Sequence, residues 1–382
     1  MNSERNPMYQ QIIGTSIYLS SIFEELENST RSVLSTPEIY NVRRIVLIGS
    51  GDSFFAAKAA EFSIMKHSKL PVEVRTSLDG GRYHSLLSNR RDIENTLVIA
   101  LSNSGMTSRT CEAVIMYKQS GANTLAITQN ASSLLAKESN NSLILPSSEL
   151  PTAPNFCSFI CSFLVLVLFG LRIGEVRMKE TMDKTGERRK ELLKHIDDLS
   201  LVINKTILPA HELAKKCRKS KYFEFIGPGS NLATAEYGAA KILEAVGRHA
   251  TACDLEEWIH LNYFDSSPEE ISTIFLSPNK SRSESRLQEI YFFMRKIRKN
   301  LVVVGGGPLI KFAEDNNGDT LLCEIDICET LSPMLLSAPI ALFAAYLSEI
   351  EGGFLERANN SLWEDSLDAG TVQKSKIMGL DI

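Results

Sequence analysis

The chain has 382 residues, which is too long for one ordinary hydrophobic core and about right for two domains. Its formal net charge of −5 argues against the basic surface of a nucleic-acid-binding protein. The seven cysteines are scattered and include no Cys-x-x-Cys pair, a pattern typical of reduced thiols in a cytosolic protein. The polar start of the chain shows no signal peptide, so we expect a cytoplasmic protein.

The first half contains strand-like runs that are rich in Val, Ile and Leu rather than alternating. Such runs are typical of parallel strands buried on both faces. Helical stretches fall between them, and this alternation predicts an α/β fold with a doubly wound parallel sheet. The predicted strands are residues 44–48, 72–76, 96–101, 123–128 and 142–145, and the predicted helices are 53–67, 108–120 and 131–138.

The same pattern restarts after a connecting region. Residues 155–171 are apolar but fall short of the about 20 residues that a transmembrane helix needs, so a buried core helix is expected. Residues 175–204 are predicted to form an amphipathic connecting helix or helix pair. Further strands are then expected at 222–226, 250–254, 271–276, 300–305 and 320–325, followed by an apolar helix at 333–347. The chain is therefore interpreted as an internal duplication, with domains at residues 1–200 and 201–382.

The two halves differ at one turn that matters for function. The turn Gly49-Ser50-Gly51-Asp52 has a counterpart in Gly227-Pro228-Gly229-Ser230. By contrast, Ser102-Asn103-Ser104-Gly105 corresponds to Ser277-Pro278-Asn279-Lys280, which has lost the glycine and gained a proline without an N–H donor. The first half is therefore predicted to hold an anion, and the second half is not.

The segment from Ser102 to Thr107 lies between a predicted strand and a predicted helix, where ligands of open α/β sheets bind. Unpaired N–H groups at a helix N-terminus attract anions, and three hydroxyls suit a phosphomonoester. Ser53, after the neighbouring strand, could reach the same phosphate. The alternative is simple helix capping, for which one hydroxyl would suffice. Phe54 stands where the third glycine of G-x-G-x-x-G belongs, so a dinucleotide is not expected.

A second group of residues suits proton transfer. Lys241 and Glu244 are three apart on a predicted helix and so share a face, and His260 follows on the next segment. The alternative for Lys241 and Glu244 is a solvated ion pair, and His260 alone would more often be structural or exposed. No metal or redox cofactor is expected, because neither His260 nor any cysteine belongs to a recognisable ligand cluster.

These motifs resemble the sugar isomerase (SIS) family, in particular the isomerase half of the glutamine:fructose-6-phosphate amidotransferases. The Ser-Asn-Ser-Gly-Met-Thr loop is similar to that family's Ser-Gln-Ser-Gly-Glu-Thr loop. The segment 238–244 is similar to its Gly-Ala-Leu-Lys-x-x-Glu helix, and His260 ends a segment that stands in place of Glu-Leu-Lys-His. Residues 339–346 and 373–375 resemble the final helix and the Ala-Lys-Ser tail. The resemblance covers nearly the whole chain and implies two tandem flavodoxin-like SIS domains.

The resemblance also implies roles for individual residues. Glu244 would move a proton between C1 and C2, with support from Lys241. His260 would open the sugar ring in the partner subunit's site, which implies a homodimer with shared sites, and Lys374 would close over the sugar. The implied phosphate ligands are Ser53, Ser102, Ser104 and Thr107, with Asn103 touching the phosphate or the sugar.

The implied function is that of a sugar-phosphate isomerase or deaminase acting on a hexose or aminohexose 6-phosphate. The expected reaction interconverts glucosamine 6-phosphate and fructose 6-phosphate with free ammonia, because no glutaminase domain and no Cys at position 2 are present. Another sugar-phosphate isomerase or deglycase, and a non-catalytic sugar-phosphate sensor, are the alternatives. The chain departs from the family at Met106, at residues 151–156, and at Leu261-Asn262, which replaces Gly-Pro after the histidine. No membrane or nucleic-acid partner is expected.

Overall fold

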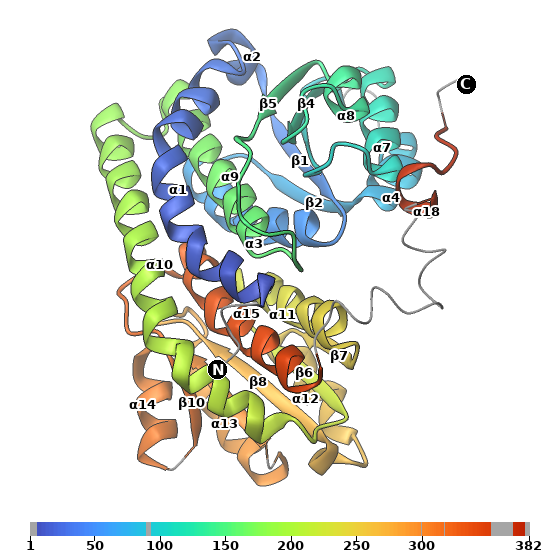
Figure 1. Ribbon diagram of the computed structural model, residues 1–382. Coiled ribbons are helices and arrows are strands. Elements are labelled where there is room, and N and C mark those ends of the chain that lie inside the picture. The colour runs from blue at the N-terminus through green and yellow to red at the C-terminus, as the bar shows by residue number, and fades with distance from the viewer. Residues whose placement is uncertain (1–5, 89–92, 299, 317, 353–369, 379–382) are drawn as a thin grey trace. The chain divides into compact units, whose positions relative to one another are not determined.

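The computed structural model describes residues 6–88, 93–298, 300–316, 318–352 and 370–378. Two five-stranded sheets, each with helices on both faces, contain all the strands of this part of the chain (Figure 1). Every strand pairing in both sheets is parallel. The predicted fold class, two tandem doubly wound α/β sheets with the flavodoxin-like strand order, is therefore confirmed.

The first sheet has the strand order β2-β1-β3-β4-β5. Its central strand β3 is buried at all six positions, which explains why its sequence is continuously apolar rather than alternating. The strands are β1 Arg44–Gly49, β2 Val72–Thr76, β3 Thr96–Leu101, β4 Asn123–Thr128 and β5 Asn141–Ile144. The helical elements are α1 Pro7–Ser32, α2 Thr36–Asn41, α3 Asp52–Ser68, α4 Ser77–Asp79, η2 Gly80–His84, α5 Ser85–Leu87, α7 Ser108–Gln119, α8 Leu134–Glu138 and α9 Cys157–Val176.

The second sheet repeats this topology, in the order β10-β9-β8-β6-β7. In both sheets the first strand of the set lies between the second and the third. The order in which strands are added across the sheet therefore reverses between the first and third strands. The strands are β6 Tyr222–Ile226, β7 His249–Cys253, β8 Ile271–Ser277, β9 Asn300–Gly305 and β10 Asp319–Leu322. The helical elements are α10 Met182–Cys217, α11 Asn231–Val246, α12 Leu255–His260, η3 Asn262–Phe264, η4 Pro268–Glu270, α13 Glu284–Ile297, α14 Gly307–Asp315, η5 Glu329–Leu331, α15 Pro333–Ile350 and α18 Gly370–Gln373.

The chain divides into two compact units that are discontinuous in sequence. The first-sheet unit comprises Tyr18–Glu149, Ser158–Leu193 and Ser361–Ile382. The second-sheet unit comprises Met1–Ile17, Leu150–Cys157 and Lys194–Asn360. Helices α1 and α10 contribute residues to both units. The two compact units therefore cannot be separated by dividing the chain at one position. The division into continuous domains at residues 1–200 and 201–382 stays a prediction.

The predicted connecting helix differs most from the structure. Helix α9 runs through Val176, and α10 begins at Met182 and continues past residue 204 and through Pro209 to Cys217. The buried positions of α10 explain this extension, because Val202, Ala210 and Ala214 continue the apolar face at helical spacing. Helix α8 is shorter than predicted, since the Ser133 hydroxyl caps the N–H of Ala136 and starts the helix at Leu134.

Helices α9 and α15 are long and apolar enough, by length and composition alone, to cross a membrane. Each of them is nevertheless 89% buried within the protein over its most apolar window, so both are core helices. Gly170 permits the close packing of α9, because a Cβ at this position would lie 3.1 Å from the backbone of Ile64 on α3. The expectation of a buried core helix after residue 155 is thus confirmed for α9.

Candidate functional site: a hydroxyl-rich loop and a buried lysine–glutamate pair

Two loops of the first-sheet unit leave adjacent strands, β1 and β3, at the point where the strand order reverses. Gly49 ends β1 and leads into α3, and Ser102 follows β3 and leads into α7. Strands β1 and β3 are neighbours, so both loops lie at the carboxyl edge of the sheet, beside one another. This topological switch point is where open α/β sheets bind ligands.

The loop after β3 is held in a fixed shape by its own hydroxyls. The Ser102 hydroxyl lies 3.1 Å from that of Thr107 and accepts the N–H of Gly105 at 3.2 Å, while the Ser104 hydroxyl accepts the N–H of Met106 at 3.2 Å. Gly105 has φ +66°, and a Cβ there would lie 2.1 Å from the Ser133 hydroxyl oxygen. Only glycine fits this turn, which keeps the loop tight against the sheet.

Helix α7 begins without a side-chain cap among the described residues. Thr107 is the N-cap residue, but its hydroxyl pairs with Ser102 rather than with an N–H of the first turn. The first turn of α7 therefore keeps unpaired N–H groups, which with the helix dipole favour an anion. This geometry weakens the capping alternative and supports a ligand role for the loop.

Hydroxyl groups behind the loops form a relay that the sequence analysis did not single out. Ser50 hydrogen-bonds to Ser77 at 2.9 Å, and Ser77 lies 2.8 Å from the Thr110 hydroxyl. The relay joins the loop after β1, the start of α4 and the first turn of α7. The position of Ser50 between Gly49 and Gly51 was the only signal in the sequence, and its partners lie far along the chain.

The equivalent position in the second-sheet unit is occupied by a carboxylate of the chain itself. Glu329 accepts a hydrogen bond from the Ser281 hydroxyl at 2.9 Å and another from the N–H of Arg282 at 3.0 Å. Its carboxylate also faces the other loop, because a Cβ on Gly229 would lie 3.5 Å from a Glu329 oxygen. An internal anion thus fills the place that a phosphate would take, which supports the prediction that the second copy does not hold one.

Phosphate affinity should therefore depend on one loop. We expect Ser104→Ala to raise the KM for a sugar phosphate several-fold, since a neutral hydrogen bond contributes about 0.5–1.5 kcal/mol. Ser104 is exposed, so the fold should tolerate the change. The control is Ser277→Ala, at the position of the second copy that corresponds to Ser102. Ser277 is fully buried, and the change should leave KM unchanged. Equal effects of the two substitutions on KM, measured by steady-state kinetics, would contradict a single phosphate cradle.

In the second-sheet unit, α11 brings Lys241 and Glu244 into direct contact. The Lys241 ammonium lies 2.5 Å from a Glu244 carboxylate oxygen. The Lys241 side chain is 0% exposed, and that of Glu244 is 44% exposed. Lys241 also lies 5.1 Å from the centre of the Tyr237 ring, which a cation approaches favourably. A lysine without solvent contact contradicts the solvated-pair alternative, because a buried ammonium is costly unless it is paired.

His260 is placed apart from this pair. It is the last residue of α12, its side chain is 66% exposed, and its Nε2 lies 3.8 Å from the carboxylate of Glu256 on the same helix. The structure therefore presents an imidazole to solvent at the end of a short helix. This placement neither joins His260 to Lys241 and Glu244 nor gives it a buried structural role.

Lys374 is exposed and belongs to a tail that docks on the helix of the hydroxyl-rich loop. Arg109, in the first turn of α7, donates hydrogen bonds to the Ser375 hydroxyl, at 3.1 Å, and to the Lys376 carbonyl. The Met378 N–H donates to the Glu112 carboxylate at 2.8 Å. Burial raises the pKa of Glu112, but the Arg82 hydrogen bond, the Met378 N–H and the Arg109 charge outweigh burial and hold that pKa below its ordinary value.

The structure thus gathers the predicted residues into two groups. Within the first-sheet unit the serine and threonine loop leads into α7, and the tail that carries Lys374 contacts Arg109 in the first turn of α7. Ser53 lies in the first turn of α3, after the neighbouring strand β1. Within the second-sheet unit Lys241 and Glu244 form one contact, and His260 lies elsewhere. In the described part of the chain, no cluster of three or more His, Cys, Asp or Glu side chains is placed to hold a metal ion.

Comparison with known proteins agrees with this geometry. Residues 38–172, which include the hydroxyl-rich loop, match the family of the SIS domain. The chain is 26% identical over 334 residues to a glutamine–fructose-6-phosphate aminotransferase (isomerizing) of Mycolicibacterium paratuberculosis, covering 86% of this chain and 51% of that protein. The chain therefore spans about half the length of the curated relatives that it matches.

Solved structures share the fold over most of the chain. The C-terminal domain of glucosamine-fructose-6-phosphate aminotransferase from Francisella tularensis superposes with a TM-score of 0.74 at 18% identity, covering 91% of this chain and 97% of that one. Glucosamine-6-phosphate deaminase from Thermotoga maritima superposes with a TM-score of 0.66 at 16% identity, and the match covers 91% of this chain and 95% of that one.

The first conclusion concerns class: the hydroxyl-rich loop at the switch point of a doubly wound sheet belongs to an SIS domain, over residues 38–172. More particularly, the chain is homologous to the isomerase domain of glutamine–fructose-6-phosphate aminotransferase, as the sequence motifs predicted.

Proposed function

We propose that this chain is a sugar-phosphate isomerase and deaminase that interconverts glucosamine 6-phosphate and fructose 6-phosphate with free ammonia. The hydroxyl-rich loop, with Ser53, would bind the phosphate, and Glu244 would move the proton between C1 and C2. Lys241 would stabilise negative charge on the enediol oxygens, and Lys374 would approach the sugar from the docked tail. The observation that carries the proposal is the Lys241–Glu244 contact.

The unequal exposure of these two side chains supports a catalytic role. A carboxylate that is 44% exposed can meet a substrate, while its lysine partner is held without solvent contact. Aldose–ketose isomerisation needs one carboxylate that removes and returns a proton. It also needs a fixed positive charge near the enediol oxygen on which negative charge develops. The similarity to glutamine–fructose-6-phosphate aminotransferase (isomerizing), over about half of that protein, is compatible with this chemistry.

The experiment must distinguish the proposed function from two alternatives. Another isomerase or deglycase would use the same proton transfer on a sugar with a different substituent at C2. A non-catalytic sensor would bind the phosphate without needing Lys241 and Glu244. The presence of Lys241 and Glu244 in direct contact favours an enzyme over a sensor.

The deciding experiment measures ammonia release from a panel of phosphorylated aminosugars, with the reverse reaction measured from fructose 6-phosphate and either ammonium or glutamine. We expect release from glucosamine 6-phosphate, and synthesis with ammonium. Turnover of a different aminosugar phosphate alone would favour the deglycase alternative. Binding of sugar phosphates without any turnover, and without exchange of carbon-bound protons, would favour the sensor.

A further inference from the structure

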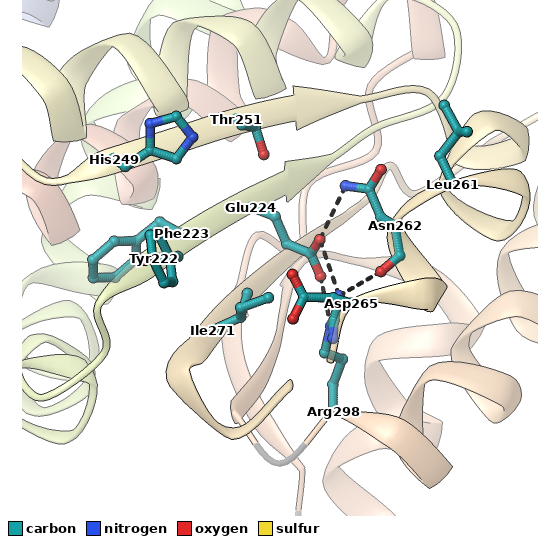
Figure 2. A pocket seen from close by; sticks show the side chains of 10 residues that line it. All are labelled: Tyr222, Phe223, Glu224, His249, Thr251, Leu261, Asn262, Asp265, Ile271 and Arg298. Atoms are coloured by element: carbon teal, nitrogen blue, oxygen red, sulfur yellow. Dashed lines mark hydrogen bonds and ion pairs between the residues drawn. The ribbon is translucent and has the colours of Figure 1, made fainter. Parts of the chain in front are cut away.

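A buried network in the second-sheet unit includes Asn262, which follows His260 by two residues in the chain (Figure 2). Figure 2 shows Glu224, on β6, pointing toward Asn262 and Arg298. The Arg298 Nε donates to one Glu224 oxygen at 2.8 Å, and the Asn262 side-chain amide donates to the other at 3.2 Å. The Thr273 hydroxyl, on β8, donates to Glu224 at 2.5 Å. The side chains of Arg298 and Glu224 are 0% and 4% exposed, so the pair is withdrawn from water.

The Arg298 guanidinium contacts the chain on both sides of His260. Its Nη2 donates to the backbone carbonyl of Asn262 at 2.9 Å, two residues after the histidine. Its central carbon lies 5.5 Å from the ring centre of Trp258, two residues before the histidine. Trp258 is fully buried against Phe293 of α13, with ring centres 6.5 Å apart. One cation therefore contacts a side chain before, and the backbone after, an imidazole that is itself largely exposed.

This arrangement has a consequence for the imidazole. Helix α12 has six residues, too few to be rigid without support from its surroundings. The His260 side chain has little packing of its own, since it is 66% exposed. Its position therefore depends on the neighbouring chain. There Arg298 contacts the Trp258 ring and the Asn262 carbonyl, and Glu224 accepts hydrogen bonds from both Arg298 and the Asn262 amide. A network that served only the stability of the fold would have no need to contact residues on both sides of His260.

We infer that Glu224, Arg298 and Asn262 are positioning residues that fix His260 for opening the sugar ring. This inference rests on the proposed function, in which Glu244 acts on the open-chain sugar, and on the role in ring opening that the family resemblance implies for His260. Ring opening breaks the bond between the anomeric carbon and the ring oxygen, with one proton moved from the anomeric hydroxyl to that oxygen. The network therefore serves one step of the reaction, and proton transfer between C1 and C2 does not depend on it.

A substrate that cannot form a ring separates these two steps. In 5-deoxyfructose 6-phosphate the hydroxyl that closes the furanose ring is absent and the terminal oxygen carries the phosphate, so the sugar stays open. Incorporation of solvent deuterium at C1, followed by NMR, reports removal of the carbon-bound proton from this sugar and from fructose 6-phosphate alike. The ratio of the two exchange rates measures ring opening, and needs no assumption about the nitrogen substituent.

The principal variant is Arg298→Lys. It keeps a positive charge beside Glu224, and so avoids an uncompensated buried carboxylate, but it lacks the planar fork that reaches both Glu224 and the Asn262 carbonyl. Misplacement of a catalytic group by about 1 Å can cost on the order of 10²-fold in rate. We expect exchange into fructose 6-phosphate to fall roughly tenfold or more, while exchange into the open-chain sugar stays at the parental rate.

Asn262→Ala is the second variant, because it removes one hydrogen bond at a half-buried position and leaves the ion pair in place. It should show the same selective loss, several-fold in size, and it decides the question if the Arg298 variant does not fold. The matched controls are Arg295→Lys and Asn316→Ala. These residues make similar contacts elsewhere, from Arg295 to the Asn316 carbonyl at 3.2 Å and from the Asn316 amide to the Phe312 carbonyl at 2.8 Å. Both should exchange as the parent does.

His260→Ala and Glu244→Gln complete the experiment. We expect the first to lose exchange into the cyclic sugar alone, and the second to lose exchange into both sugars. If His260→Ala is selective but the Arg298 and Asn262 variants lose both activities equally, or lose neither, the positioning role is overturned and the proposed function stands. If His260→Ala is not selective, the ring-opening role of His260 and the positioning role both fail, while the proton transfer proposed for Glu244 stands. If Glu244→Gln exchanges normally, the proposed function itself fails.

Discussion

Glu244→Gln should lower kcat by about 10²–10⁴-fold, because positioned general acid–base groups contribute that much to the rate. The glutamine side chain keeps the size of glutamate and can still accept a hydrogen bond from Lys241, but it cannot take up a proton. Glu244 is 44% exposed, so the fold should tolerate the change. Substrate affinity should be retained, since phosphate binding is assigned to another loop. Steady-state kinetics and direct binding of the sugar phosphate measure the two quantities separately.

The matched control for this prediction is Glu212→Gln. Glu212 pairs with Lys215 at 2.9 Å with the same three-residue spacing on a helix, but both side chains are at least half exposed. Such a solvated pair contributes little, so kcat should not change. A near-normal kcat for Glu244→Gln, comparable to the control, would remove the proton-transfer role of Glu244 and would favour the sensor alternative.

Mixing two inactive variants should restore activity if the active sites are shared between subunits. We expect Glu244→Gln and His260→Ala homodimers each to be nearly inactive on the cyclic substrate. After subunit exchange, a mixed dimer would contain one site with both residues intact, so about a quarter of the parental activity would return when exchange is complete and each dimer is formed at random. The exposure of His260 at the end of α12 is compatible with a role outside its own subunit.

Activity and subunit exchange must be measured in the same sample, with differently tagged chains showing that mixed dimers have formed. A mixture of Glu244→Gln with Lys241→Met provides the control, because both changes disable the same site and no mixed dimer can complete it. If mixed dimers form and activity stays at the level of this control, His260 acts within its own subunit. A monomer by sedimentation analysis would contradict the shared site directly.

The sequence predicted some features of the candidate site and left others open. The sequence predicted the contact between Lys241 and Glu244, because a three-residue spacing on a helix brings two side chains together whatever surrounds them. It also predicted that the serine loop would lie at the carboxyl edge of a parallel sheet, since β3 is continuously apolar and a helix follows it. What the sequence left open was whether the pair is solvated, and the complete burial of Lys241 decided that question.

The sequence by itself determined the repeated strand–helix pattern, the difference between the two phosphate-loop copies and the local pairing on α11, because each depends on residues a few positions apart. Only the tertiary structure placed Glu329 in the second loop, docked Ser375 on Arg109, and set Arg298 against Glu224 beside His260. These partners are separated by tens to hundreds of residues. Their meeting depends on strand order and register, which bring distant segments together and leave no periodic trace in the sequence.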